Sequence, residues 1–182
     1  ASLSKEGPEL KEFLGGVATS LDNFCDRAPE GEVEVAGGVQ RVIQRNNWKI
    51  FFENLHDTIH AVATHESSWR AAKEEFEAMP AGTRKPFEVV IVDGNGEPLE
   101  FWEKLELKGY DNGHGFMEGI FVPPTDPVSL AYVAALEAAQ GAERADQILR
   151  VNRHNTIVYP SCSPHTSFQQ IRVIRPLSVD RT

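Results

Sequence analysis

The segment "NWKIFFENLHDTIHAVATHESS", residues 47 to 68, concentrates side chains that can bind a metal ion. It holds His56, His60 and His65, three of the six histidines in the chain, together with Asp57. The last two of these histidines and the aspartate form the pattern D-x2-H-x4-H. Imidazole nitrogens suit iron, zinc, copper and nickel, and two histidines with one carboxylate suit non-haem Fe(II) that keeps open coordination positions. The pattern therefore predicts a metal site.

The spacing of these residues sets a condition on the backbone. Asp57 and His60 are three positions apart, so they share one face of a helix. His60 and His65 are five positions apart and converge on one ion only if the helix ends, bulges or kinks between them. The β-branched residues of "AVATHESS" weaken a helix, so we expect an irregular turn there. Spacing alone leaves open the alternative of a solvated helix that binds no metal. His56 is expected to lie outside the set.

Composition narrows the class of protein. The 182 residues suit one domain, and the net charge of −9 comes without any Lys/Arg cluster that would favour nucleic-acid binding. No apolar run approaches the length of a membrane span, and the acidic balance gives no support to a role at a membrane surface. The two cysteines, Cys25 and Cys162, are interpreted as reduced thiols, which favours a cytoplasmic protein.

Strand and helix patterns form separate runs along the chain. Strands are expected at 32–45 (with a hairpin at Gly37 and Gly38), 47–52, 87–92, 99–107, 115–122, 155–160 and 167–176. Helices are expected at 10–24 (interrupted by Gly15 and Gly16), 68–79, 125–141 and 142–150. In the clearest helix, Asp126 is the expected cap, Pro127 suits the first turn and Gly141 ends it. Segregated runs of this kind predict an α+β fold with an antiparallel sheet.

The segment 47–68 resembles the catalytic domain of Rieske non-haem iron oxygenases, the ring-hydroxylating oxygenase alpha subunits. The residues that carry the resemblance are Asn47, Trp48, Lys49, Glu53, Asn54, Asp57, His60 and His65. A looser similarity continues through "LDNFCDRAPEGEVEVAGG", "LRVNRHNTIVYPS" and "QIRVIRPLSVD", so it covers most of the chain. The resemblance implies a helix-grip α+β fold, in which helices wrap an antiparallel sheet.

The resemblance also implies roles for individual residues. His60 and His65 correspond to two of three ligands of a mononuclear Fe(II), and the third ligand, a carboxylate, is expected beyond Thr182. Asp57 corresponds to the bridge that carries electrons to the iron from a cluster in the neighbouring subunit. Its physical role is that of a carboxylate that orients a ligand histidine. Asn54 corresponds to a residue close to the iron.

The family also binds a 2Fe–2S cluster, held by two cysteines and two histidines in a separate Rieske domain. In this chain only "CSPH", Cys162 to His165, fits half of that pattern, and we interpret it as a coincidence in a loop. We therefore expect residues 1–182 to be part of the catalytic domain, in a truncated chain that lacks the Rieske domain.

The activity implied by the resemblance is the reduction of dioxygen at the iron and the hydroxylation of an aromatic or similar apolar substrate, as in aromatic hydrocarbon catabolism. The electrons come from NAD(P)H through a reductase, often with a ferredoxin. The expected partners are thus the substrate, dioxygen, these electron carriers and further copies of the chain in a trimer. The sequence leaves open whether a beta subunit is a further partner. Nucleic acid and membrane are not expected partners, and the fragment alone is expected to be inactive.

Two alternatives remain open from the sequence. A zinc hydrolase could use the same two histidines, but it needs a third ligand and a general base within this chain. A non-enzymatic carrier of apolar ligands could share the helix-grip architecture, because fold alone does not fix function. If the protein is such a carrier, the His60→Ala variant should still bind the ligand.

Overall fold

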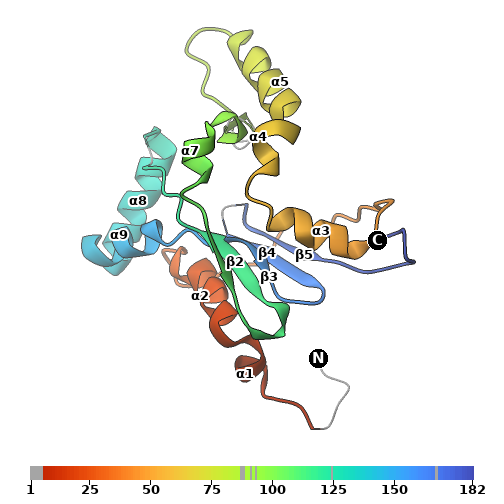
Figure 1. The fold of residues 1–182 in the computed structure, drawn as a ribbon. Helices are drawn as coiled ribbons and strands as arrows, with labels where there is room; N and C mark the ends of the chain where they lie inside the picture. The colour runs from red at the N-terminus through yellow and green to blue at the C-terminus, as the bar shows by residue number, and fades with distance from the viewer. Residues whose placement is uncertain (1–5, 87–88, 91, 93, 124, 167) are drawn as a thin grey trace. The chain divides into compact units, whose positions relative to one another are not determined.

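The structure, a computed structural model, describes residues 6–86, 89–90, 92, 94–123, 125–166 and 168–182. The chain forms two compact units (Figure 1). The strand unit comprises Ala1–His56 and Glu106–Thr182, and the helical unit comprises Asp57–Leu105. None of the helices in these described ranges combines the length and the apolar character that crossing a lipid bilayer requires.

The strand unit contains two antiparallel sheets. The first has the order β1 (Glu106–Gly109), β2 (Gly115–Glu118) and β3 (His154–Ile157), and the second is the hairpin of β4 (Cys162–His165) and β5 (Gln170–Val173). A bridge between Val158 and Cys162 joins β3 to β4. The predicted α+β class with antiparallel sheets is confirmed.

The helices of this unit include several that the sequence predicts. The unit contains α1 (Leu10–Leu14), a 3-10 turn (Gly15–Val17), α2 (Ala18–Asp26), α3 (Trp48–Leu55), a second 3-10 turn (Asp111–Gly113), α8 (Pro127–Gln140) and α9 (Ala142–Arg150), and the sequence predicts these α-helices except α3. The predicted interruption at Gly15 and Gly16 is confirmed by the 3-10 turn. The predicted ends of α8 are confirmed too, since Asp126 accepts from the backbone N–H groups of Val128 and Ser129 and Gly141 follows the last turn.

Strand β3 lies between two helices. The buried Ile157 belongs to an apolar cluster with Phe52 and Leu55 of α3 and with Ile174. The preceding residue, Thr156, is fully buried and hydrogen-bonds to Ser20 of α2. Because successive strand side chains point to opposite faces, α3 and α2 cover opposite faces of β3. Figure 1 shows α3 running along the sheet on one side.

Helices α8 and α9 pack together around a small core of their own, in which Leu136, Ala145 and Ile148 are buried. The Arg27 guanidinium, just after α2, donates to the carbonyl oxygens of Leu149 and Val151 at 3.1 Å. These bonds fix the helix pair to the end of α2.

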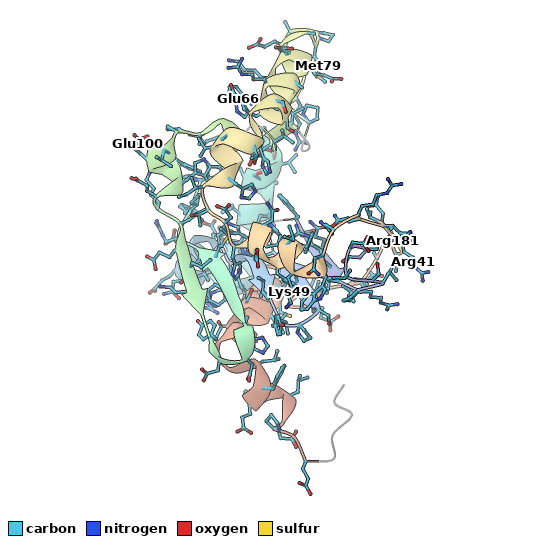
Figure 2. All side chains as sticks on the ribbon, turned by 45° about the vertical axis from the view of Figure 1, so that its right-hand side comes forward. Arg41, Lys49, Glu66, Met79, Glu100 and Arg181 are labelled. Carbon is cyan, nitrogen blue, oxygen red and sulfur yellow. The ribbon has the colours of Figure 1, made fainter. Side chains whose placement is uncertain are left out.

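The helical unit contains α4 (His60–Thr64), α5 (Glu66–Glu77), a 3-10 turn (Gly94–Gly96) and α7 (Leu99–Trp102). Figure 2 labels Glu66 at the start of α5 and Met79 just beyond its end. The backbone at Gly96 lies against the Trp69 ring, where an added Cβ would stand 3.0 Å from the ring. The predicted helix at 68–79 is confirmed, with a start two residues earlier.

The predicted strand at 47–52 is wrong, because this stretch forms helix α3. The Asn47 side chain caps the helix by accepting from the backbone N–H of Lys49 at 3.0 Å. The apolar residues Trp48, Phe51, Phe52 and Leu55 follow the i, i+3, i+4, i+7 spacing of a helix, and they form its packed face.

Other strand predictions are wrong as well. Residues 32–46 form no ladder between themselves and are irregular and mostly exposed, with a backbone pairing of Gln44 to Thr182. The labelled Arg41 and Arg181 lie near this pairing (Figure 2). Helix α7 occupies the first part of the expected strand 99–107. Of the expected strand 87–92, positions 87, 88 and 91 lie outside the described residues, and the described positions 89, 90 and 92 are helical.

The stretch "CSPH" is a strand rather than a loop, since it forms β4 and pairs with β5. Its alternation places Ser163 and His165 on one face and Cys162 and Pro164 on the other. Both Ser163 and His165 are buried.

The buried His165 makes stability depend on pH. Burial, with smaller contributions from the Arg172 guanidinium and His154, lowers the pKa of His165 from 6.5 to about 3. Between pH 6.5 and 3, His165 is therefore protonated in the unfolded chain and neutral in the folded chain. The free energy of unfolding falls by up to about 1.4 kcal/mol per pH unit through this residue until the pH approaches 3.

We expect urea unfolding of a His165→Gln variant to lose less stability than the wild type between pH 6.5 and 4. Equal slopes for the two proteins over this range would show that His165 titrates alike in the folded and unfolded chains.

Candidate metal centre

Asp57 precedes helix α4 and caps its N-terminus. Its Oδ1 accepts hydrogen bonds from the backbone N–H of Ile59 at 2.9 Å and of His60 at 3.1 Å. These two N–H groups, Ile59 first, lower the pKa of Asp57 because they favour its charged form. The carboxylate is thus ionised and positioned at neutral pH, while half of its side chain (50%) is exposed.

The orientation of His60 follows from the same turn. Its Nδ1 lies 3.0 Å from the carbonyl oxygen of Asp57 and 3.6 Å from the Oδ2 of that residue. A carbonyl oxygen only accepts, so Nδ1 carries the proton in the neutral ring and Nε2 carries the lone pair. Histidines that ligate metals commonly donate their other ring N–H to a carbonyl or carboxylate oxygen in this way.

The helix is interrupted at His65. Helix α4 ends at Thr64, His65 has φ −94° and ψ 3°, and α5 begins at Glu66. The rings of His60 and His65 lie edge to face, with their centroids 5.0 Å apart and an angle of 87° between their planes. The predicted interruption is confirmed, and it brings together two side chains that a continuous helix would separate.

The arrangement fits part of a metal site. It provides two imidazoles, one of which is oriented by Asp57. Across the described ranges, no group of three or more His, Cys, Asp or Glu side chains is placed to hold a metal ion. The iron ligand expected beyond Thr182 stays a prediction. The zinc hydrolase gains no support from the described residues, because it needs its third ligand within this chain.

The other residues of the motif lie in the strand unit. Asn54 is an exposed residue of α3, and its carbonyl oxygen accepts from the N–H of His56. The position of Asn54 close to iron stays a prediction. His56 donates through Nε2 to the carbonyl oxygen of Asn155 at 2.9 Å, and burial lowers its pKa.

A second polar group, which the sequence did not predict, lies on the β4–β5 hairpin. Ser163 and His165 alternate along β4, and Arg172 of β5 lies directly across from Ser163. The signal available in the sequence was the alternation S-x-H followed by Q-x-R at hairpin distance.

Two curated relatives match the chain along its whole length. Toluate 1,2-dioxygenase subunit alpha from Pseudomonas putida is 30% identical over 190 residues, which are 100% of this chain and 38% of the relative. The 2-halobenzoate 1,2-dioxygenase large subunit from Burkholderia cepacia is 30% identical over 185 residues, 100% of this chain and 37% of the relative. The homologues of this chain are thus ring-hydroxylating dioxygenase alpha subunits. No family model matches the chain.

A solved structure agrees with these relatives. A naphthalene 1,2-dioxygenase mutant bound to phenanthrene superposes with a TM-score of 0.59 and 25% sequence identity, over 98% of this chain and 38% of that one. The resemblance read from residues 47–68 to the alpha subunits is therefore confirmed. The chain spans less than two fifths of the length of the relatives that it matches.

The geometry of His60 predicts its tautomer. Because Nδ1 donates to the carbonyl oxygen of Asp57, we expect the neutral ring to be protonated at Nδ1. Two-dimensional ¹H–¹⁵N correlation of the ring nitrogens at pH 8 measures this directly. The Asp57→Ala variant should keep the same tautomer, since the acceptor is the backbone. A ring protonated at Nε2 in the wild type would contradict the structure.

Proposed function

We propose that this chain is the iron-binding part of the catalytic domain of a Rieske-type ring-hydroxylating oxygenase. The observation that supports this most is the pair of His60 and His65, edge to face across the break between α4 and α5. The homologous alpha subunits give the pair its chemical context. Residues 1–182 then belong to the catalytic domain, and the Rieske domain lies elsewhere in the whole protein.

The proposed roles divide between ligation and orientation. A mononuclear Fe(II), when bound, supplies the centre at which dioxygen is reduced. His60 would bind it through Nε2, because Nδ1 holds its proton against the carbonyl oxygen of Asp57. His65 would be the second ligand, and an aspartate beyond Thr182 the third. Asn54 would lie close to the metal without being a firm ligand.

Asp57 would also form the electron-transfer bridge. Two backbone N–H groups lower the pKa of its carboxyl and so favour the charged form, and half of its side chain is exposed. It therefore has acceptor capacity left for a donor from a neighbouring subunit, such as a histidine bound to a 2Fe–2S cluster. This role implies an oligomer, which we propose to be a trimer. We propose the cytoplasm as its location. NAD(P)H-derived electrons would arrive through a reductase, with or without a ferredoxin.

The substrate class that we propose is an aromatic acid. The two relatives described above are named for toluate and 2-halobenzoate, which are both benzoate derivatives. The same names, "subunit alpha" and "large subunit", support a smaller beta subunit as a partner.

The metal ligands are tested by Co(II) titration of the whole protein, followed by its visible absorption. We expect His60→Ala and His65→Ala each to weaken Co(II) binding at least tenfold, because each removes an imidazole ligand. His56→Gln is the matched control, since His56 hydrogen-bonds within the strand unit. If both alanine variants bind Co(II) as the wild type does, the two histidines are not ligands.

The bridge is tested with Asp57→Asn in the whole protein. The amide can keep the side-chain oxygen that caps α4, so we expect iron content to change little. Product formation with NAD(P)H should fall about 10- to 100-fold, because the negative charge that would couple His60 to the donor of the neighbouring subunit is lost. Single-turnover reduction of the iron distinguishes slow electron transfer from poor substrate binding. Wild-type reduction rates in Asp57→Asn would exclude the bridge.

A further inference from the structure

The β4–β5 hairpin gathers three hydrogen-bond donors on one face. Ser163 pairs with Arg172 across the ladder, and His165 follows Ser163 by two positions. Side chains at these positions point to the same side of a sheet. Ile174, two residues after Arg172, shares that side and packs against α3. The three donors therefore lie on the sheet face that α3 covers in part.

Arg172 is a half-buried cation on β5. Loss of solvent lowers the pKa of its guanidinium. Among the residues that the structure describes, no carboxylate lies within 4.0 Å of this group. Its Nη1 donates to Oδ1 of Asn155 at 3.3 Å, which uses one of five N–H groups. Desolvating a charge without an opposite charge is costly, so the site favours an anion.

The two neighbours of Arg172 on β4 present donors as well. The Ser163 hydroxyl is fully buried and has no hydrogen-bond partner among the residues that the structure describes. His165 accepts from the backbone N–H of Phe168 at its Nδ1, at 3.2 Å, so its neutral ring carries the proton on Nε2. A guanidinium, a hydroxyl and an imidazole N–H on one face match the several acceptor sites of a carboxylate.

An aromatic surface adjoins these donors. The Phe168 ring stacks on His165 with parallel planes and a centroid distance of 4.0 Å, and Phe168 remains 39% exposed. Asn155, which anchors Arg172, is held in turn by the hydrogen bond from His56 to its carbonyl oxygen. The donors are thus positioned on the sheet, next to a ring on which an aromatic ligand can pack.

We propose that Ser163, His165 and Arg172 form a binding site for the carboxylate of an aromatic acid, whose ring packs beside Phe168. Arg172 provides the charge, and Ser163 and His165 provide neutral donors. The inference rests on the proposed function for the class of acid, and it concerns the strand unit alone.

The test is calorimetric titration of the chelator-treated, metal-free protein with benzoate, benzamide and acetate. We expect saturable binding of benzoate at one site, with binding of benzamide and acetate at least tenfold weaker. Arg172→Gln should weaken benzoate binding at least tenfold, since it removes a charge-assisted hydrogen bond. Arg175→Gln is the matched control, because Arg175 is an exposed arginine three residues away; it should bind benzoate as the wild type does.

Ser163→Ala provides a second variant that should fold. It removes a buried hydroxyl that has no partner in the described part of the chain, so the urea midpoint should stay unchanged or rise. Its benzoate affinity should nevertheless fall several-fold. Benzoate binding that is absent, equalled by acetate, or unaffected by Arg172→Gln would overturn the proposal.

These measurements separate the two proposals. Because the titration uses metal-free protein, loss of benzoate binding with intact Co(II) binding at His60 and His65 overturns only the carboxylate site. If Arg172→Gln weakens benzoate binding but His60→Ala and His65→Ala leave Co(II) binding unchanged, the iron centre is overturned and the carboxylate site stands.

Discussion

On a regular α-helix each residue advances by about 100°, so side chains five positions apart diverge by about 140°. Helix α4 avoids this divergence by ending at Thr64, after five residues, and the non-helical backbone of His65 leads into α5. At the other end, Asp57 caps the same short helix and orients His60 through its carbonyl oxygen. Ligation and electron transfer, as proposed, both depend on this single interrupted turn.

A second constraint organises the strand unit. Strand β3 has a helix against each face, and its alternation assigns Thr156 to α2 and Ile157 to the α3 cluster. The next strands, β4 and β5, continue the surface on which Arg172 and its neighbours lie. The polar residues there are held by backbone pairing rather than by a loop, which favours a fixed arrangement of donors.

Much of the candidate site could be predicted from sequence, because it is local. Asp57, His60 and His65 lie within nine positions, and weak helix formers mark the break between the histidines. Helix α8 was predictable for the same reason, since its cap and its terminal glycine are neighbours of its ends. The aromatic run at 47–52 was wrongly predicted as a strand, because its β-forming residues also follow the helical spacing that buries Phe52 and Leu55. The group around Arg172 was missed because only the hairpin register brings Ser163 beside it.

The interrupted helix is tested most directly by nuclear Overhauser spectroscopy of the protein with labelled histidine rings. We expect a cross-peak between ring protons of His60 and His65, whose ring centroids lie 5.0 Å apart. The cross-peak should survive in Asp57→Asn, because the break at His65 is independent of that carboxylate. Absence of a cross-peak, together with helical backbone shifts running unbroken from His60 through Trp69, would contradict the account.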